Sequence, residues 1–126
     1  MPDAQYIETY GLTVSSYAAG EFVFRAGENG NCAYLVTKGA VAIVSTNEKG
    51  ERVTNVVVPP GEIFGEMSVL RSEPRSADAI AAKDSECIMI EQEIMAKRLA
   101  NADPFIRFWI EFMSDRLRDL AKRTHA

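Results

Sequence analysis

A glutamate and an arginine nine residues apart carry the clearest chemistry in this sequence. Glu66 and Arg75 lie in the stretch from Phe64 to Ala77. A short helix that begins after Gly65 would leave unpaired N–H groups at its start, and such groups attract an anion. Arginine neutralises phosphate through paired hydrogen bonds, and a carboxylate beside the anion is tolerable if it accepts a hydrogen bond from a ligand hydroxyl. These residues therefore predict a pocket for a sugar phosphate.

The same stretch resembles a known motif. Phe64-Gly65-Glu66-Met67 followed by Arg75-Ser76-Ala77 is similar to the phosphate-binding cassette of the cyclic nucleotide-binding domain family. The resemblance implies that Glu66 binds the ribose 2′-hydroxyl and that Arg75 binds the cyclic phosphate together with backbone amides. Solvated loop charges would be the simpler interpretation of an isolated pair, but the joint motif favours a ligand site. The ligand contacts it implies are Phe64, Gly65, Glu66, Met67, Ser68, Arg75, Ser76 and Ala77.

The choice of base is less strongly indicated. In the family, threonine after the arginine often accompanies a preference for cGMP, and alanine a preference for cAMP. Ser76 falls between them, so the resemblance implies cAMP as the first expectation and cGMP as the alternative. Val56 and Val58 are candidates for the apolar wall of the pocket, although plain core positions explain them equally well. No further cofactor is expected.

Composition limits the class of protein. The chain has 126 residues, of which 47% are apolar and 25% charged, as in an ordinary globular domain. The net charge of −4 gives no electrostatic support for nucleic-acid binding. No apolar run approaches the length of about 20 residues that a membrane span needs. Two isolated cysteines and no signal peptide predict a cytoplasmic chain with reduced thiols, and we expect one domain over 1–126.

Alternation and turn residues predict a mainly β fold before the cassette and shortly after it. Strands are expected around Leu12 to Phe24 and at 33–38, 40–46, 52–58, 77–82 and 86–91. A hairpin at Gly39 is expected to join the strands 33–38 and 40–46. Strands at this spacing indicate a sandwich or barrel. The family resemblance makes the expectation specific: a double-stranded β-helix (jelly-roll) barrel over about 12–91 with a short cassette helix.

The C-terminal part is predicted to be helical over about 92–124. Residues 92–100 favour helix by composition, and Asp103-Pro104 is a typical helix start. Beyond it, apolar residues recur every three or four positions, which predicts a long amphipathic helix. Its wide apolar face could pack on the barrel, form a homodimer or bind a partner protein, or close over the ligand. For closure, the candidate lid residues are Arg116, Leu117 and Leu120.

Other functions find less support. The single histidine, His125, cannot build a histidine-based metal site, and no nucleophile motif or phosphate-binding loop of an enzyme is present. Few residues follow Leu120, so no helix-turn-helix is expected within this chain. A domain that kept the fold but lost its ligand remains an alternative, as does a regulatory fragment of a channel, kinase or transcription regulator. The interpretation we favour is a non-catalytic cyclic nucleotide sensor whose ligand moves the terminal helix.

Overall fold

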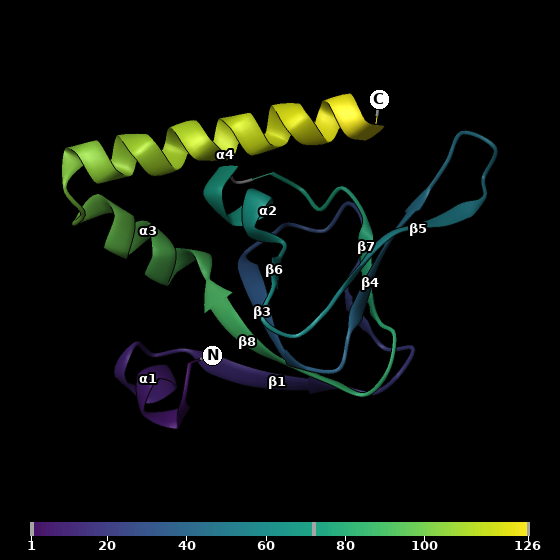
Figure 1. Cartoon of the computed structure of the whole chain (residues 1–126), viewed down its shortest axis with the longest axis horizontal. Helices are drawn as coiled ribbons and strands as arrows, with labels where there is room; N and C mark the ends of the chain where they lie inside the picture. The colour runs from purple at the N-terminus through teal and green to yellow at the C-terminus, as the bar shows by residue number, and fades with distance from the viewer. Residues whose placement is uncertain (1, 72, 126) are drawn as a thin grey trace.

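The computed structural model describes residues 2–71 and 73–125, without the side chains of Met67, Leu70, Arg71, Ser114, Leu117, Arg118 and 121–125. Eight short strands form its centre, and most of its helices lie at the ends of the chain (Figure 1). In chain order the elements are α1 (Ala4–Thr9), β1 (Thr13–Tyr17), β2 (Phe22–Phe24), β3 (Cys32–Lys38), β4 (Val41–Thr46), β5 (Arg52–Val58), β6 (Ile63–Phe64), α2 (Glu66–Arg71), β7 (Asp78–Ala81), β8 (Ser85–Glu91), α3 (Gln92–Ala100) and α4 (Pro104–His125).

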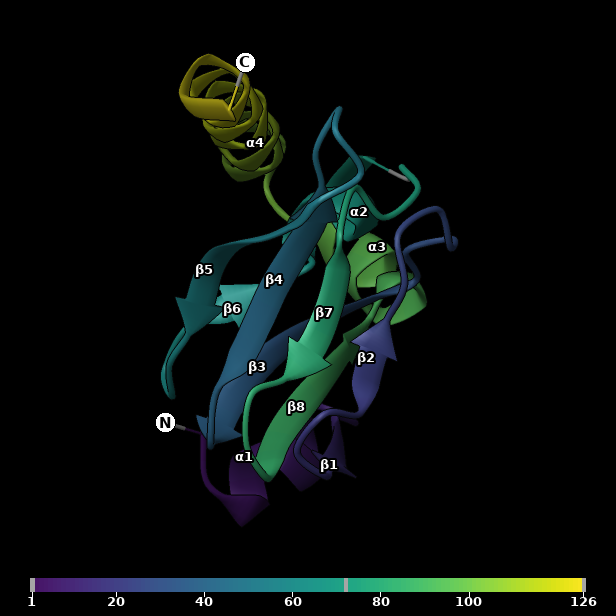
Figure 2. The same ribbon diagram turned by 90° about the vertical axis from the view of Figure 1, so that its right-hand side faces the viewer.

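The strands form two antiparallel four-stranded sheets, as expected for a jelly roll. One sheet has the order β1-β8-β3-β6 and the other the order β2-β7-β4-β5. Figure 2 shows them as two layers, with β5, β4, β7 and β2 in front of β3 and β8. Apolar side chains from both layers fill the space between them, and most of the buried positions lie in β3, β4, β7 and β8. This core contains Cys32, Tyr34, Val36, Val41, Val58, Phe64, Ala79 and Cys87.

The hairpin predicted at Gly39 is wrong. The strands on either side of Gly39 belong to different sheets: β3 pairs with β8 and β6, whereas β4 pairs with β7 and β5. At Gly39 the chain passes from one sheet to the other, and this corner packs against Asp84 and Ser85, where the chain passes from β7 to β8. The Ala40 N–H donates to Ser85 Oγ at 3.1 Å, and a Cβ at Gly39 would collide with Asp84 and Ser85. A tight bend alone does not distinguish a hairpin from such a corner.

The predicted helix starts are confirmed. α3 begins at Gln92, and α4 begins at Pro104 with the Asp103 carboxylate accepting the Phe105 N–H at 2.8 Å. α4 runs along one side of the molecule, and its main contact is with α2 (Figure 1). In Figure 2 it stands clear of both sheets. Packing on the barrel therefore does not cover its apolar face, where these residues are exposed: Phe105, Ile106, Phe108, Trp109, Ile110, Phe112, Met113 and Leu120.

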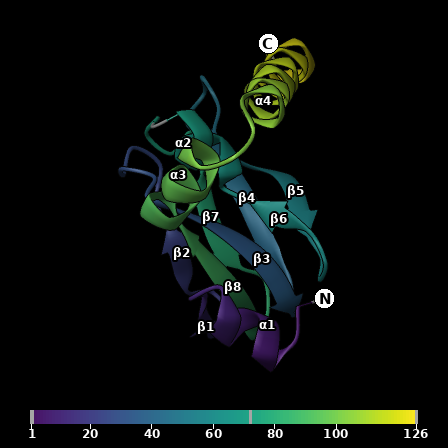
Figure 3. The ribbon, with the colours of Figure 1, turned by 90° about the vertical axis from the view of Figure 1, so that its left-hand side faces the viewer.

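α1 and α3 lie on the outer side of the β1-β8-β3-β6 sheet (Figure 3). α1 is capped by Asp3, whose carboxylate accepts the Tyr6 N–H at 2.8 Å. α3 continues directly from β8, and the Gln92 amide side chain donates to the Val69 carbonyl of α2 at 3.2 Å. α3 is thus joined to the cassette helix. None of the described helices combines the length and the apolar character that crossing a membrane requires.

Candidate functional site

A cavity of about 410 Å³ opens where the cassette meets the two sheets. Its size lies within the range of small-molecule sites. Every predicted ligand contact except Met67, whose side chain is not described, borders it. The lining residues are Phe24, Ile43, Val56, Val58, Glu62, Ile63, Phe64, Gly65, Glu66, Ser68, Arg75, Ser76 and Ala77. Residues far apart in the chain therefore meet at one concave surface.

Arg75 is a buried cation at this cavity. It is 5% exposed, and no described carboxylate lies within 4.0 Å of its guanidinium. Nη1 donates to the Gly65 carbonyl at 2.9 Å, and Nη2 donates to the Cys32 carbonyl. Burial lowers the pKa of Arg75, yet a guanidinium stays protonated at neutral pH. With five N–H donors and two of them bound to carbonyls, it retains donors for an anion.

Two aromatic rings hold the guanidinium in place. The Arg75 Cζ atom lies 4.0 Å from the centre of the Phe24 ring and 5.9 Å from that of Tyr34. Such stacking stabilises a cation without neutralising its charge. Burial raises the pKa of the Tyr34 phenol to about 12, so this ring adds no negative charge near neutral pH. The aromatic contacts thus position Arg75 and leave its charge available.

The backbone of Arg75 is fixed by the loop after β2. Its N–H donates to the Glu28 carbonyl at 2.8 Å, and its carbonyl accepts the Gly27 N–H at 2.8 Å. On the other side of this loop, Gly30 touches the cassette so closely that a Cβ there would lie 2.1 Å from Ser68 Cβ. The loop therefore fixes the positions of both Arg75 and the cassette helix.

Gly65 and Glu66 bring the cassette backbone to the arginine. Gly65 has φ +77°, a conformation that other residues adopt at a cost, and it leads directly into α2. Glu66 is the first residue of that helix, is half-buried and borders the cavity. A carboxylate and a guanidinium thus face one cavity without forming an ion pair, an arrangement suited to a ligand with both a hydroxyl and an anion.

The apolar side of the cavity differs in part from the predicted wall. Val58 is buried and Val56 is 50% exposed, and both line the cavity. The sequence reasoning missed Phe24, Ile43, Glu62 and Ile63. Phe24 and Ile43 lie in strands whose alternation identifies them as apolar, but only the pairing of β4 with β7 and β5 brings Ile43 beside the cassette. No local signal identifies that neighbourhood.

Two of the three predicted lid residues, Arg116 and Leu120, do not border the cavity in this arrangement. Among the described side chains, none from α4 contributes to its lining. The Arg116 guanidinium lies 5.8 Å from the ring centre of Phe112 on the same helix, and Leu120 is exposed. The Leu117 side chain lies outside the description. The lid therefore stays a prediction about a closed arrangement.

Known proteins share this sequence pattern and fold. The family model for the cyclic nucleotide-binding domain matches residues 14–102. The cyclic AMP receptor protein of Thermus thermophilus is 39% identical over 77 residues, which cover 61% of this chain and 36% of that protein. Mouse (Mus musculus) cGMP-dependent protein kinase 2 is 27% identical over 114 residues, which cover 89% of this chain and 15% of the kinase.

A solved structure has the same arrangement. The cAMP-bound form of the EAL enzyme Bd1971 superposes with a TM-score of 0.76 at 26% identity, over 90% of this chain and 30% of that one. The cGMP-bound form of the same enzyme gives a TM-score of 0.74 at 28% identity, over 88% and 30%. This chain spans little more than a third of these relatives at most. Its sequence match and its two-sheet fold with a cassette together show that it belongs to the cyclic nucleotide-binding domain family.

Proposed function

We propose that this chain is a cyclic nucleotide sensor that binds cAMP in preference to cGMP. The observation that carries the proposal is the buried Arg75, which has no carboxylate partner among the described residues and faces the same cavity as Glu66. A buried cation is costly unless something neutralises it, and a cyclic phosphate supplies that charge. The guanidinium binds the phosphate oxygens with the cassette amides of Gly65, Met67 and Ser68. Glu66 accepts the ribose 2′-hydroxyl.

The purine is expected to lie against the apolar side of the cavity. Val56, Val58 and Ile43 offer β-branched side chains there, and Ala77 is small enough to leave room for a ring. Ser76 is exposed at the rim, where its hydroxyl could reach either the phosphate or a guanine amino group. The relatives include a cyclic AMP receptor and a cGMP-dependent kinase, so the preference for cAMP rests on position 76 not being the threonine that often accompanies cGMP preference in the family.

The signal is proposed to leave the domain through α4. α2 contacts α4, and α2 carries Glu66 and Ser68. Closure of the cassette on a ligand would therefore change the position of α4. A ligand shifts this equilibrium only by its different affinity for the two arrangements. In the closed arrangement Arg116, Leu117 and Leu120 would approach the base. Unchanged affinity in both Leu117→Ala and Leu120→Ala would remove the lid from the proposal.

The exposed face of α4 favours a homodimer. Phe108 is 62% exposed and Trp109 54%, and neighbouring apolar residues extend the patch along the helix. Exposed apolar patches of this kind mark interaction surfaces. A second copy presents the same face, so two α4 helices could pack along their apolar stripes. Ligand-driven movement of α4 would then alter the geometry of the dimer or of an attached effector.

Isothermal titration calorimetry with cAMP and with cGMP tests the binding proposal. Arg75→Ala is expected to weaken binding by about 2–4 kcal/mol, because the charged partner of the phosphate is lost. Arg75→Lys serves as the milder variant if the alanine form folds poorly. Arg25→Ala is the matched control: its guanidinium also stacks on a phenylalanine, 3.7 Å from the Phe22 ring centre, but lies outside the cavity.

The outcomes separate ligand binding from interaction alone. Binding that Arg75→Ala abolishes and Arg25→Ala preserves supports the sensor. A folded chain by circular dichroism that binds neither nucleotide would make it a ligand-free interaction module, with α4 as its working surface. Binding that survives in Arg75→Ala would contradict the phosphate assignment.

A further inference from the structure

The outer face of the β1-β8-β3-β6 sheet is apolar where a sheet facing water is usually polar. Ile88 pairs with Leu35, and Leu35 pairs with Ile63, so these three residues form a row across β8, β3 and β6. Their sequence neighbours Cys87, Val36 and Phe64 point into the core. Because side chains alternate along a strand, the row must lie on the opposite face.

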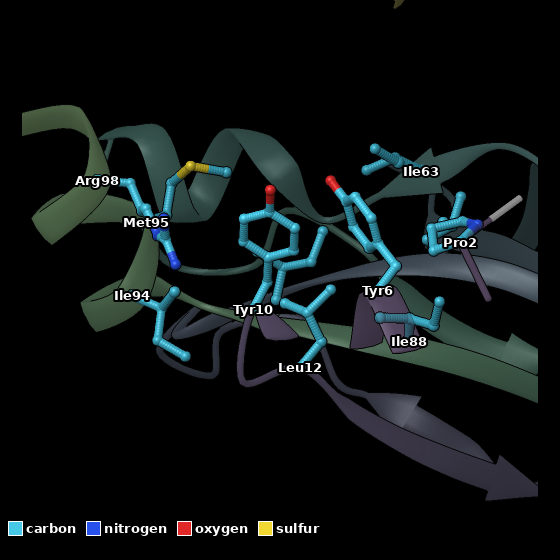
Figure 4. A pocket seen from close by; sticks show the side chains of 11 residues that line it. Pro2, Tyr6, Tyr10, Leu12, Ile63, Ile88, Ile94, Met95 and Arg98 are labelled. Atoms are coloured by element: carbon cyan, nitrogen blue, oxygen red, sulfur yellow. The ribbon is translucent and has the colours of Figure 1, made fainter. Parts of the chain in front are cut away.

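α1 and α3 cover this face only in part. Between them lies a second cavity of about 410 Å³, which we call the outer trough. Figure 4 shows its labelled side chains in sequence from Arg98 and Met95 at one end, past Tyr10 and Leu12, to Tyr6, Ile63 and Pro2 at the other. The trough is thus elongated rather than round. Its lining consists of Pro2, Tyr6, Tyr10, Leu12, Leu35, Ile63, Ile88, Ile90, Ile94, Met95 and Arg98.

Among the described residues of this lining, Arg98 alone is charged. Its Cζ atom lies 5.0 Å from the ring centre of Tyr10, and no described carboxylate lies within 4.0 Å of it. The ring holds the guanidinium at the end of the trough and leaves its donors free for an acidic group. One cationic end and an apolar length match an amphiphile with an anionic head.

We propose that the outer trough binds a free medium-chain carboxylate. The carboxylate lies at Arg98, and the alkyl chain runs over the partly exposed Leu35 toward Pro2. Apolar surface that remains exposed in the free protein, notably on Tyr6, Tyr10 and Ile63, is covered by the chain. The burial of methylene groups supplies most of the affinity, and Arg98 selects the acid over the neutral alcohol.

This site is separate from the cyclic nucleotide cavity. Phe64 faces the core side of β6 and Arg75 lies on that side, whereas Arg98 lies beyond the outer face of the sheet. Ile63 borders both cavities, so the test leaves it unchanged. The two proposals can therefore be tested independently: the chain could bind a nucleotide without a fatty acid, or a fatty acid without a nucleotide.

The test is a titration of the ¹⁵N-labelled chain, followed by amide chemical shifts, with hexanoate, octanoate and decanoate below their micelle concentrations. We expect saturable shifts in α1, β8 and α3, with affinity rising by up to about fourfold for each added methylene. Decanol should bind about two- to fivefold more weakly than decanoate. The single tryptophan, Trp109 on exposed α4, should show unchanged fluorescence, which excludes coating of that helix.

Three variants decide the assignment. Arg98→Gln should lower the affinity for decanoate by about two- to fivefold and leave the affinity for decanol unchanged. Lys97 is the adjacent cation and lies outside the lining, so Lys97→Gln should change neither affinity. Ile94→Trp, with a dispersed spectrum as proof of folding, should fill the trough and abolish binding of both. Shifts centred on α4, equal effects of Arg98→Gln and Lys97→Gln, or full affinity in Ile94→Trp would each overturn the proposal.

Discussion

The guanidinium of Arg75 and the backbone of Gly65 fit each other too closely for any side chain between them. Nη1 of Arg75 donates to the Gly65 carbonyl at 2.9 Å, and a Cβ at Gly65 would lie 2.7 Å from that same nitrogen. The glycine therefore serves two purposes, since its φ of +77° also turns the chain into α2. The motif Gly-Glu thus depends on an arginine located ten residues away.

Gly65→Ala should weaken cyclic nucleotide binding by tenfold or more, because the new methyl group displaces the Arg75 guanidinium. Gly61→Ala is the matched control: Gly61 has φ +92°, yet a Cβ there would meet nothing within 4 Å. Both variants should lose about 1–2 kcal/mol of folding free energy from the backbone conformation alone. Denaturation and calorimetry separate the two effects, and equal affinity losses in both variants would contradict the close fit.

Glu66→Gln should reduce the affinity for cAMP by about 1–3 kcal/mol, because a charge-assisted hydrogen bond to the ribose is weakened. The affinity for the 2′-deoxy analogue of cAMP, which lacks this hydroxyl, is measured for comparison. The native chain should discriminate against the analogue, and Glu66→Gln should discriminate far less. If the variant distinguishes the two ligands as strongly as the native chain does, Glu66 does not contact the 2′-hydroxyl.

Phe108→Glu should dissociate the proposed dimer, because a carboxylate would be buried in an apolar interface at a cost of about 3 kcal/mol. Sedimentation equilibrium measures the change in the dimer dissociation constant. Arg107→Glu introduces the same residue one position earlier on α4 and should have a small effect. A native chain that stays monomeric at high concentration, with and without nucleotide, would assign the exposed face to another partner.

Asp78→Asn should lower stability at neutral pH and flatten its acid dependence. Asp78 accepts the Ala26 N–H at 2.7 Å and a guanidinium hydrogen of Arg52 at 2.8 Å, and these bonds hold the pKa of Asp78 below its ordinary value. Because the folded pKa is lowered, the stabilisation is present above the ordinary pKa and disappears as the pH falls through the lowered one.

The expected loss in Asp78→Asn is about 1–2 kcal/mol at pH 7, kept small because Arg52 is half-exposed. Urea denaturation over about pH 7 to pH 2 measures it. Asp119→Asn, which removes an exposed carboxylate on α4, is the control. An unchanged acid dependence in Asp78→Asn would show that these bonds do not stabilise the fold.

The local order of the fold was accessible from sequence because it depends on neighbours along the chain. Alternation in Arg52 to Val58 and in Glu86 to Glu91 predicted strands, and Asp103-Pro104 predicted the start of α4. The motif of Glu66 and Arg75 also lies within ten residues, so its meaning could be recognised without coordinates. The residues that border the cavity were largely found in this way.

Contacts between distant segments were decided only by the tertiary structure. Alternation shows that β3 and β4 are strands but not that they join opposite sheets, because pairing energy depends on which distant strand is available. The stacking of Phe24 on Arg75, the approach of Gly30 to Ser68 and the outer trough arise in the same way. Sequence determined the chemical groups and their local conformation, whereas long-range packing decided which of them share a cavity.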